Sequence, residues 1–335
     1  MGVSETVRTV ADEATRLAMY RMMVEARLFE RRVHDLFLEG LVKGTTHLAL
    51  GEEAIAAGFA AALRRDDLVY CTYRGHVHTL LRGAPMSGLM AELLGRASGV
   101  CGGKGGSMHL TDVAHGAMGS YAIVGAHMPI AAGAAWAAKE RGTGQVVVCF
   151  FGDGTTNIGA FHEALNLAAV WELPVVFVCE NNLYMEYTPI GSVTAVENPA
   201  ADRASAYGLE SILVDGNDAD EMYVTARRCV DKARSGGGPS LVEAKTYRHT
   251  GHSRADPGKY RPDAEVEVWL ARDPIPRLRE RMLASGVEPS VFDEVEQAAQ
   301  ELVDRATEEA RSAPLPDPSS LLTELWADGG SAWRN

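Results

Sequence analysis

VVVCFFGDG at residues 146–154 and VVFVCENN at residues 175–182 are two apolar runs that each end in polar, oxygen-bearing side chains. Continuous apolar runs of this length are typical of strands that are covered on both faces. One helical stretch, GAFHEALNLAAVWE from Gly159, lies between them. A strand, a helix and a second strand form a right-handed parallel unit, so both runs end at the same edge of one sheet. We therefore expect Asp153 and Asn182 to lie close together at that edge.

The same alternation continues on both sides of this unit. A third apolar run, SLVEA, occupies residues 240–244, and further helical stretches begin at Pro129 and at Asp218, the second with an acidic N-cap. Alternating strands and helices predict an α/β fold with a doubly wound, mostly parallel sheet flanked by helices.

Changes in pattern divide the chain into four parts. Apolar residues at helical spacing predict one amphipathic helix over residues 13–38, and Pro, Gly and charged residues after Gly251 predict a loop. The predicted parts are an N-terminal helical arm (1–40), a cofactor-binding α/β domain (41–250), a mobile active-site loop (251–265) and a helical C-terminal extension (266–335).

The composition limits the class of function. The 335 residues are 46% hydrophobic, enough for a large core, and the formal net charge of -13 disfavours nucleic acid as a partner. No run approaches the roughly 20 apolar residues of a membrane span, and no basic segment precedes an apolar one, so we expect a cytoplasmic protein without membrane contact. The odd number of scattered cysteines fits a reducing compartment. We interpret these as buried small hydrophobic side chains: Cys71, Cys101, Cys149, Cys179 and Cys229.

Asp153 and Asn182 carry the oxygen ligands that Mg²⁺ prefers, and Mg²⁺ usually shares its coordination sphere with phosphates and water. Glycine and aspartate alone are ordinary turn residues, so GDG at residues 152–154 is a weak signal by itself. The 26 residues between this turn and Asn181-Asn182 make it specific. This spacing resembles the GDG-x(26)-NN signature of thiamin diphosphate enzymes, which bind Mg²⁺ with the cofactor.

Further segments narrow the resemblance to one family. The chain resembles the alpha subunit of the thiamin diphosphate-dependent component of 2-oxo acid dehydrogenase complexes, of the pyruvate, branched-chain or acetoin type. The resemblance extends over about residues 15–315 and implies the thiamin diphosphate-binding fold. The matching segments are GTTHLALGEEA (44–54), YRGH (73–76), GKGGSMH (103–109), IVGA (123–126), ENNLY (180–184) and GHSRADPG (251–258).

The resemblance assigns roles to individual residues. It implies that Mg²⁺ is held by the Asp153 and Asn182 side chains and by the backbone carbonyl of Tyr184. His47 and His252 match two catalytic histidines of the family, and histidine can transfer a proton near neutral pH. The implied cofactor contacts are Tyr73, Arg74, Val124, Gly152, Asp153, Gly154, Thr155, Asn182, Tyr184 and His252.

The implied activity is oxidative decarboxylation of a 2-oxo acid, with a pyruvate-like substrate and acyl transfer to lipoyl-lysine on a partner acyltransferase. The acceptor is then a disulfide, and the cofactor supplies the carbanion chemistry. In this family the catalytic glutamate belongs to a beta subunit, so we expect an α2β2 heterotetramer. We interpret Glu52 and Glu53 as acids at a helix N-terminus.

Two alternatives remain open. The chain could serve an acetoin-cleaving or carboligase enzyme that uses the same cofactor without lipoyl transfer. It could instead be a magnesium-nucleotide binding module, which the absence of a G-x-x-x-x-G-K-[ST] loop disfavours.

Some positions depart from the family pattern. Ala126-His127 replace the Thr-Gln that helps to hold potassium in branched-chain enzymes, which favours another substrate class. Tyr-Met-Glu at residues 184–186, where many members have Tyr-Gly, indicates a reshaped channel. Ser253 follows His252 at a position that is phosphorylated in some eukaryotic members.

Overall fold

The computed structural model describes residues 11–323. Outside this range lie the first ten residues of the predicted N-terminal arm and the last twelve of the predicted C-terminal extension. Most of the N-terminal stretch in which no basic segment precedes an apolar one also lies outside it. Within the described range, no helix is long and apolar enough to cross a membrane.

A parallel sheet of six strands forms the centre of the described fold, in the order β2-β1-β3-β4-β8-β7. The three apolar runs of the sequence form β3, β4 and β8 of this sheet, whereas β1, β2 and β7 were not predicted. The strands are β1 (Leu68–Thr72), β2 (Ala117–Tyr121), β3 (Val147–Gly152), β4 (Val175–Asn181), β7 (Ile212–Asp215) and β8 (Ser240–Lys245), with a separate hairpin of β5 (Tyr184–Met185) and β6 (Thr188–Pro189).

Helices surround the sheet. The expected long helix forms over residues 13–38, with Asp12 as an N-cap that accepts from the Thr15 amide, and Asp218 caps α7 as predicted. The helices are α1 (Glu13–Leu38), α2 (Glu53–Ala62), α3 (His76–Leu81), α4 (Met86–Leu93), α5 (His127–Arg141), α6 (Gly159–Val170), α7 (Ala219–Arg234), α8 (Asp263–Leu270), α9 (Pro274–Ala284) and α10 (Pro289–Ser312). Short 3-10 helices are η1 (Gly106–Met108), η2 (Val113–His115), η3 (Asp153–Asn157), η4 (Ile190–Ser192), η5 (Ala201–Tyr207) and η6 (Pro318–Leu322).

Successive side chains of β3 enter two different cores. Val147, Cys149 and Phe151 pack against α5 and α6 on one face of the sheet. Val148 and Phe150 pack against α2 and α7 on the other. A strand that is covered on both faces needs apolar side chains at every position, which explains the uninterrupted run in the sequence. The doubly wound α/β fold is confirmed.

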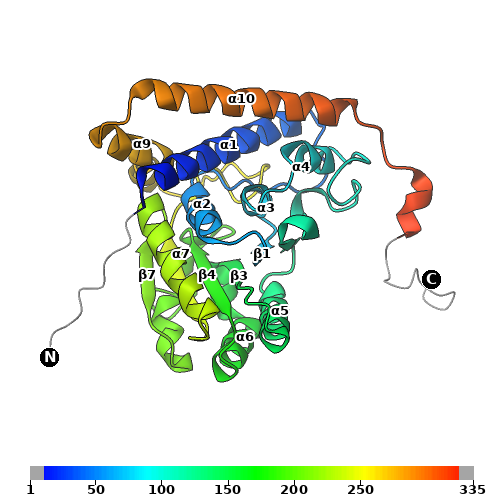
Figure 1. Cartoon of the computed structure of the whole chain (residues 1–335). Coiled ribbons are helices and arrows are strands. Elements are labelled where there is room, and N and C mark those ends of the chain that lie inside the picture. The colour runs from blue at the N-terminus through cyan, green and yellow to red at the C-terminus, as the bar shows by residue number, and fades with distance from the viewer. Residues whose placement is uncertain (1–10, 324–335) are drawn as a thin grey trace.

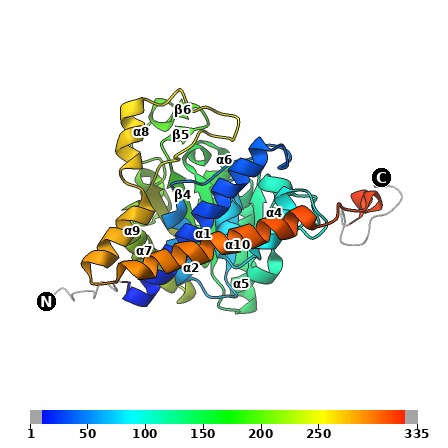
Figure 2. The same cartoon turned by 90° about the horizontal axis from the view of Figure 1, so that it is seen from above.

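A third helical layer lies over α2. Figures 1 and 2 show α10 running along α1, with α4 close to its carboxyl end. Arg27 of α1 reaches inward and forms ion pairs with Glu53 at the start of α2 and, at 2.8 Å, with Asp273 before α9. These contacts fix the amino end of α2, which faces the edge of the sheet where β4 ends.

The cysteines differ in their burial. Those at positions 71, 149, 179 and 229 are buried, as expected. The expectation is wrong for Cys101, which is only partly covered because it lies in a glycine-rich loop beyond α4. All five are free thiols.

Candidate active site at the carboxyl ends of the strands

The candidate site lies where the sheet reverses its winding. From β1 the chain proceeds to β2 on one side, whereas from β3 it proceeds to β4 on the other. The carboxyl ends of such neighbouring strands leave a crevice in which α/β proteins bind ligands. A cavity of about 600 Å³ occupies this position, lined by residues that follow β1, β3, β4 and β8.

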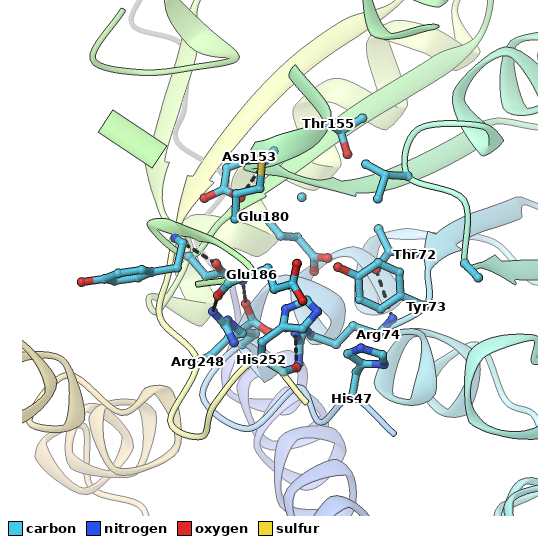
Figure 3. A pocket seen from close by; sticks show the side chains of 18 of the residues that line it. His47, Thr72, Tyr73, Arg74, Asp153, Thr155, Glu180, Glu186, Arg248 and His252 are labelled. Atoms are coloured by element: carbon cyan, nitrogen blue, oxygen red, sulfur yellow. Dashed lines mark hydrogen bonds and ion pairs between the residues drawn. The ribbon is translucent and has the colours of Figure 1, made fainter. Parts of the chain in front are cut away.

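Each residue that the sequence assigned to the site lines this one cavity. Figure 3 shows Asp153 and Thr155 on one side of the space and Arg248, His252 and His47 on the other. The roles of the assigned residues stay predictions. The residues brought together are His47, Tyr73, Arg74, Val124, Gly152, Asp153, Gly154, Thr155, Asn182, Tyr184 and His252.

Asp153 begins η3 directly after β3 and is 3% exposed. Its Oδ1 accepts the Gly154 amide at 2.7 Å, while its Oδ2 is buried and accepts no hydrogen bond from residues 11–323. Burial raises the pKa of Asp153 to about 7, although the Gly154 amide and Arg248 oppose this. A buried carboxylate oxygen without a donor is suited to a cation, which would stabilise the ionised form.

Asn182 approaches from the loop after β4. Its Nδ2 donates to Glu52 Oε1 at 2.9 Å, and its Oδ1 accepts the Tyr184 amide at 3.3 Å. Leu183 and Glu186 both have positive φ, at 73° and 55°, which is unusual for residues other than glycine. Such strained backbone is frequent at functional sites, and here it shapes the short β5-β6 hairpin over the cavity.

Glycines allow close approach in this region. A Cβ on Gly154 would lie 2.6 Å from Met185 Cγ, so a larger residue here requires the Met185 side chain to move. At Gly152 the position of a Cβ is open, and the backbone is accessible from the cavity. The Tyr-Met-Glu sequence at residues 184–186 does reach the cavity, since both Met185 and Glu186 line it.

Two arginines form the opposite wall. Arg74 donates to the carbonyls of Leu48 and, at 3.0 Å, of His252, so its guanidinium is held in place by the protein. Arg248 is 1% exposed, and its Nη2 donates to the Glu186 carbonyl at 3.2 Å. The Nε and Nη1 of Arg248 have no acceptor among the described residues. Buried guanidinium donors of this kind match the oxygens of a phosphate.

The two histidines flank Tyr73. The His47 ring lies 4.5 Å from the Tyr73 ring and 4.9 Å from the His252 ring, between centroids. Burial, reinforced by the charge of Arg74, lowers the pKa of His47 to about 2 and that of His252 to about 4. Both rings are therefore neutral near pH 7 in this chain, and each can donate one hydrogen bond and accept another.

Sequence reasoning missed three charged residues of the cavity. Arg248 lies just before the GHSRADPG segment that carried the family resemblance, so that segment could have pointed to it. Glu180 precedes the Asn pair and bonds His78 at 2.8 Å. Burial lowers the pKa of His78, but the Glu180 carboxylate, with added contributions from Glu52 and the Arg74 backbone, raises this pKa overall.

The third missed residue is Glu52. As expected, Glu52 and Glu53 lie at the start of α2, with Glu52 at the N-cap position, but the sequence did not reveal where the Glu52 side chain points. Its side chain forms no capping hydrogen bond because it turns into the cavity, where it bonds Asn182. Glu53 stays at the helix end, where it accepts the Gly51 amide at 2.9 Å.

These donors and acceptors fit a divalent cation with a diphosphate. Among residues 11–323, no group of three or more His, Cys, Asp and Glu side chains is placed to hold a metal ion. A cation at Asp153 would therefore need neutral amide and carbonyl oxygens, together with oxygens of its ligand. Mg²⁺ accepts such a set, since it binds through one or two carboxylates plus phosphates and water.

The fold and the cavity together define a doubly wound α/β protein with a polar binding crevice at the switch point of its sheet. A family model described as dehydrogenase E1 component matches residues 20–319. The chain therefore belongs to the dehydrogenase E1 component family. It is an alpha subunit of the thiamin diphosphate-dependent 2-oxo acid dehydrogenase type, as its relatives also indicate.

Three curated relatives cover nearly the whole chain. The alpha subunit of acetoin:2,6-dichlorophenolindophenol oxidoreductase from Bacillus subtilis is 44% identical over 315 residues, which are 94% of each chain. The subunit of the same name from Cupriavidus necator is 41% identical over 317 residues, 94% of this chain and 95% of the relative. The pyruvate dehydrogenase E1 component subunit alpha from Zymomonas mobilis is 40% identical over 317 residues, 94% of this chain and 89% of the relative.

Proposed function

We propose that this alpha subunit binds thiamin diphosphate with Mg²⁺ in the crevice described above and contributes to cleavage of a carbon–carbon bond next to a carbonyl group. The observation that carries the proposal is the pairing of unsatisfied buried groups across one cavity, Asp153 Oδ2 on one wall and Arg248 Nε and Nη1 on the other. When bound, the cofactor supplies the carbanion chemistry that neither wall can perform.

The residues of the chain then bind and orient the cofactor. Asp153, the Asn182 amide oxygen and the Tyr184 carbonyl hold Mg²⁺, and Arg248 joins Tyr73 and Arg74 in holding the diphosphate. Gly152, Gly154, Thr155 and Val124 supply close backbone contacts to the cofactor. His47, which is buried, and His252, which is partly exposed, are both neutral and are placed to exchange a proton with the substrate.

For the substrate, the relatives favour acetoin, a neutral hydroxyketone, over a pyruvate-like 2-oxo acid. The two acetoin-type subunits are 44% and 41% identical to this chain, against 40% for the pyruvate-type subunit. Oxidative decarboxylation of pyruvate is the second candidate, favoured by the pyruvate-type relative. Both substrates deliver a two-carbon unit, which we propose passes to lipoyl-lysine, a disulfide acceptor on an acyltransferase.

We further propose that the chain works in the cytoplasm in an α2β2 assembly whose beta subunit supplies the catalytic glutamate. Exposed apolar side chains support a covering partner, because Val124, which lines the cavity, is 46% exposed and its neighbour Ile123 is 72% exposed.

The test is a substrate comparison with the chain assembled with its beta subunit. Each substrate is supplied at equal concentration with dichlorophenolindophenol as the electron acceptor, and acetaldehyde and carbon dioxide are measured as the products. Acetaldehyde from acetoin, with kcat/KM at least about tenfold above that for pyruvate, supports the first candidate. Carbon dioxide from pyruvate as the main product supports the second, and no turnover of either contradicts both.

A further inference from the structure

The side chains of the two adjacent glutamates at the start of α2 point in different directions. Glu53 is fully buried and pairs with Arg27, which ties α2 to α1. Glu52 is 4% exposed but turns toward the cavity, although a glutamate at a helix N-cap could satisfy backbone amides instead. The side chain of Glu52 thus serves the cavity rather than the helix.

Glu52 connects the two walls of the cavity. Its Oε1 accepts from Asn182 Nδ2 at 2.9 Å, and its Oε2 lies 3.6 Å from Arg74 Nε. Oε2 is buried and has no hydrogen-bond partner among the described residues. A buried carboxylate oxygen without a donor costs free energy, so its persistence beside a cavity calls for a functional reason.

The contact with Asn182 decides which end of the amide faces the cavity. An asparagine side chain carries an oxygen that accepts and an NH₂ group that donates, and rotation exchanges them. A carboxylate can bond only the NH₂ end. Glu52 therefore holds Nδ2 and leaves Oδ1 on the opposite side, where it also accepts the Tyr184 amide. The amide oxygen stays available to a cation, and the NH₂ group cannot replace it.

We propose that Glu52 is a positioning residue that locks the Asn182 amide in its metal-binding orientation and, through Arg74, links the cation site to the diphosphate site. This inference rests on the proposed function, since it requires that Asn182 binds the metal. Outer-shell partners of metal ligands typically change metal affinity by about 10- to 100-fold when they are removed. We expect an effect of this size on the dissociation constant of Mg²⁺-thiamin diphosphate.

The test uses calorimetric titration of thiamin diphosphate at fixed Mg²⁺ into the chain assembled with its beta subunit. Glu52→Ala is expected to raise the dissociation constant by about 10- to 100-fold. Glu210→Ala, which removes an exposed glutamate, serves as the control and is expected to bind like the wild type. Circular dichroism and thermal melting of the free chain establish that each variant is folded.

A partner exchange separates positioning from a merely structural role. Asn182→Asp places two carboxylates against each other and is expected to weaken binding strongly. Adding Glu52→Gln restores a donor and an acceptor at the same 2.9 Å contact with the roles reversed. The double variant is therefore expected to bind at least about tenfold more tightly than Asn182→Asp alone.

The outcomes distinguish this inference from the proposed function. If the assembled wild type does not bind the cofactor, the proposed function fails, and the inference fails with it. If the wild type binds while Glu52→Ala stays within twofold of it, only the inference is overturned. If Glu52→Ala does not fold, the partner exchange decides, and a double variant no better than Asn182→Asp overturns the inference.

Discussion

At the scale of the residue, the cavity is distinguished by buried polar groups without partners. Five buried atoms of the cavity neither donate nor accept a hydrogen bond within residues 11–323: Arg248 Nε and Nη1, Asp153 Oδ2, Glu52 Oε2 and His47 Nδ1. Buried polar atoms in folded proteins are nearly always satisfied, and each exception calls for a ligand, a water or a catalytic role. These five atoms belong to residues that line one cavity, which supports a polar, charged ligand there.

Arg248 offers the first prediction at this scale. Arg248→Gln removes the charge and the two-donor fork, so thiamin diphosphate should bind about 10- to 100-fold more weakly, in line with about 1.5–3 kcal/mol for a charged hydrogen bond. Arg248→Lys keeps the charge, so its affinity for thiamin diphosphate should lie between those of the wild type and Arg248→Gln. Calorimetry on the assembled enzyme measures the change, with exposed Arg228→Gln as the control. Unchanged affinity in Arg248→Gln would remove this residue from the diphosphate site.

His127 gives a prediction about pH and stability. It is fully buried, and its Nε2 donates to the Phe150 carbonyl at 2.8 Å. Burial lowers its pKa to about 4, against weak opposition from that carbonyl and Glu180. In the unfolded chain, His127 takes up a proton near pH 6.5, whereas in the folded chain it does so only near pH 4. The contribution of neutral His127 to the free energy of unfolding is therefore intact above pH 7 and is lost as the pH falls toward 4.

The expected loss from His127 between pH 7 and pH 5.5 is about 1 kcal/mol in the free energy of unfolding. His127→Gln retains a donor for Phe150 but cannot titrate, so its stability should fall less steeply over this interval. Urea unfolding of the free chain at several pH values measures both slopes. Parallel slopes for the two proteins would show that His127 does not titrate as described.

At the scale of the element, the loop after Gly251 is organised by one carboxylate. Asp256 accepts the His252 amide, the Gly258 amide at 2.8 Å and the Tyr260 hydroxyl at 2.8 Å. The His252 carbonyl in turn holds Arg74. The hydrogen bonds of Asp256 thus fix the backbone that presents His252 to the cavity. The predicted mobility of residues 251–265 stays a prediction, and α8 begins within that range at Asp263.

Asp256→Ala should loosen this loop without unfolding the chain. We expect amide hydrogen exchange to rise at least about tenfold at residues 251–260 and cofactor affinity to drop, because three hydrogen bonds of about 1 kcal/mol each are lost. Asp231→Ala, an exposed substitution on α7, is the control. Exchange that is unchanged in the loop would show that other contacts hold it.

The elements differ in how far the sequence revealed them. Strands β3 and β4 were predictable because burial on both faces requires continuous apolar runs, and α1 because its apolar residues keep helical spacing. Strand β2 has the sequence AMGSY, in which glycine and serine weaken the strand signal. Strand β7 (ILVD) is a short edge strand, and its three apolar residues are fewer than the four to eight that mark a strand in a sequence.

The site was predictable where a motif marks it and was missed where only three-dimensional contact does. Asp153 and Asn182 belong to a spaced signature, and the winding of the sheet explains why they meet. Glu52 was placed correctly at the start of a helix, but its contact with Asn182 was missed, because their 130-residue separation is bridged only in the fold. Arg248 follows β8, a neighbour of β4 in the sheet but distant in sequence, and no spacing rule connected it to Asp153.

At the scale of the whole molecule, apolar side chains stay exposed beside the cavity and on the α5-α6 side of the sheet. Val124, which lines the cavity, and its neighbour Ile123 are exposed. Trp136 and Trp171, with ring centroids 5.9 Å apart, are each nearly half exposed on the α5-α6 side. Exposed apolar groups of this size commonly mark contacts with another chain.

We therefore predict that the purified chain alone shows no turnover of acetoin or pyruvate, whereas the assembled enzyme does. The same assay in both preparations, at equal concentrations of this chain, measures the difference, which we expect to exceed about a thousandfold. Full activity of the single chain would contradict the proposed division of the active centre.

The most direct test of the central claim is calorimetric titration of thiamin diphosphate into the assembled enzyme, with and without Mg²⁺, in the wild type, Asp153→Ala and the control Asp231→Ala. The proposed function predicts Mg²⁺-dependent binding that persists in the control and disappears in Asp153→Ala. Absence of binding in the folded, assembled wild type, or equal binding in Asp153→Ala, would contradict it.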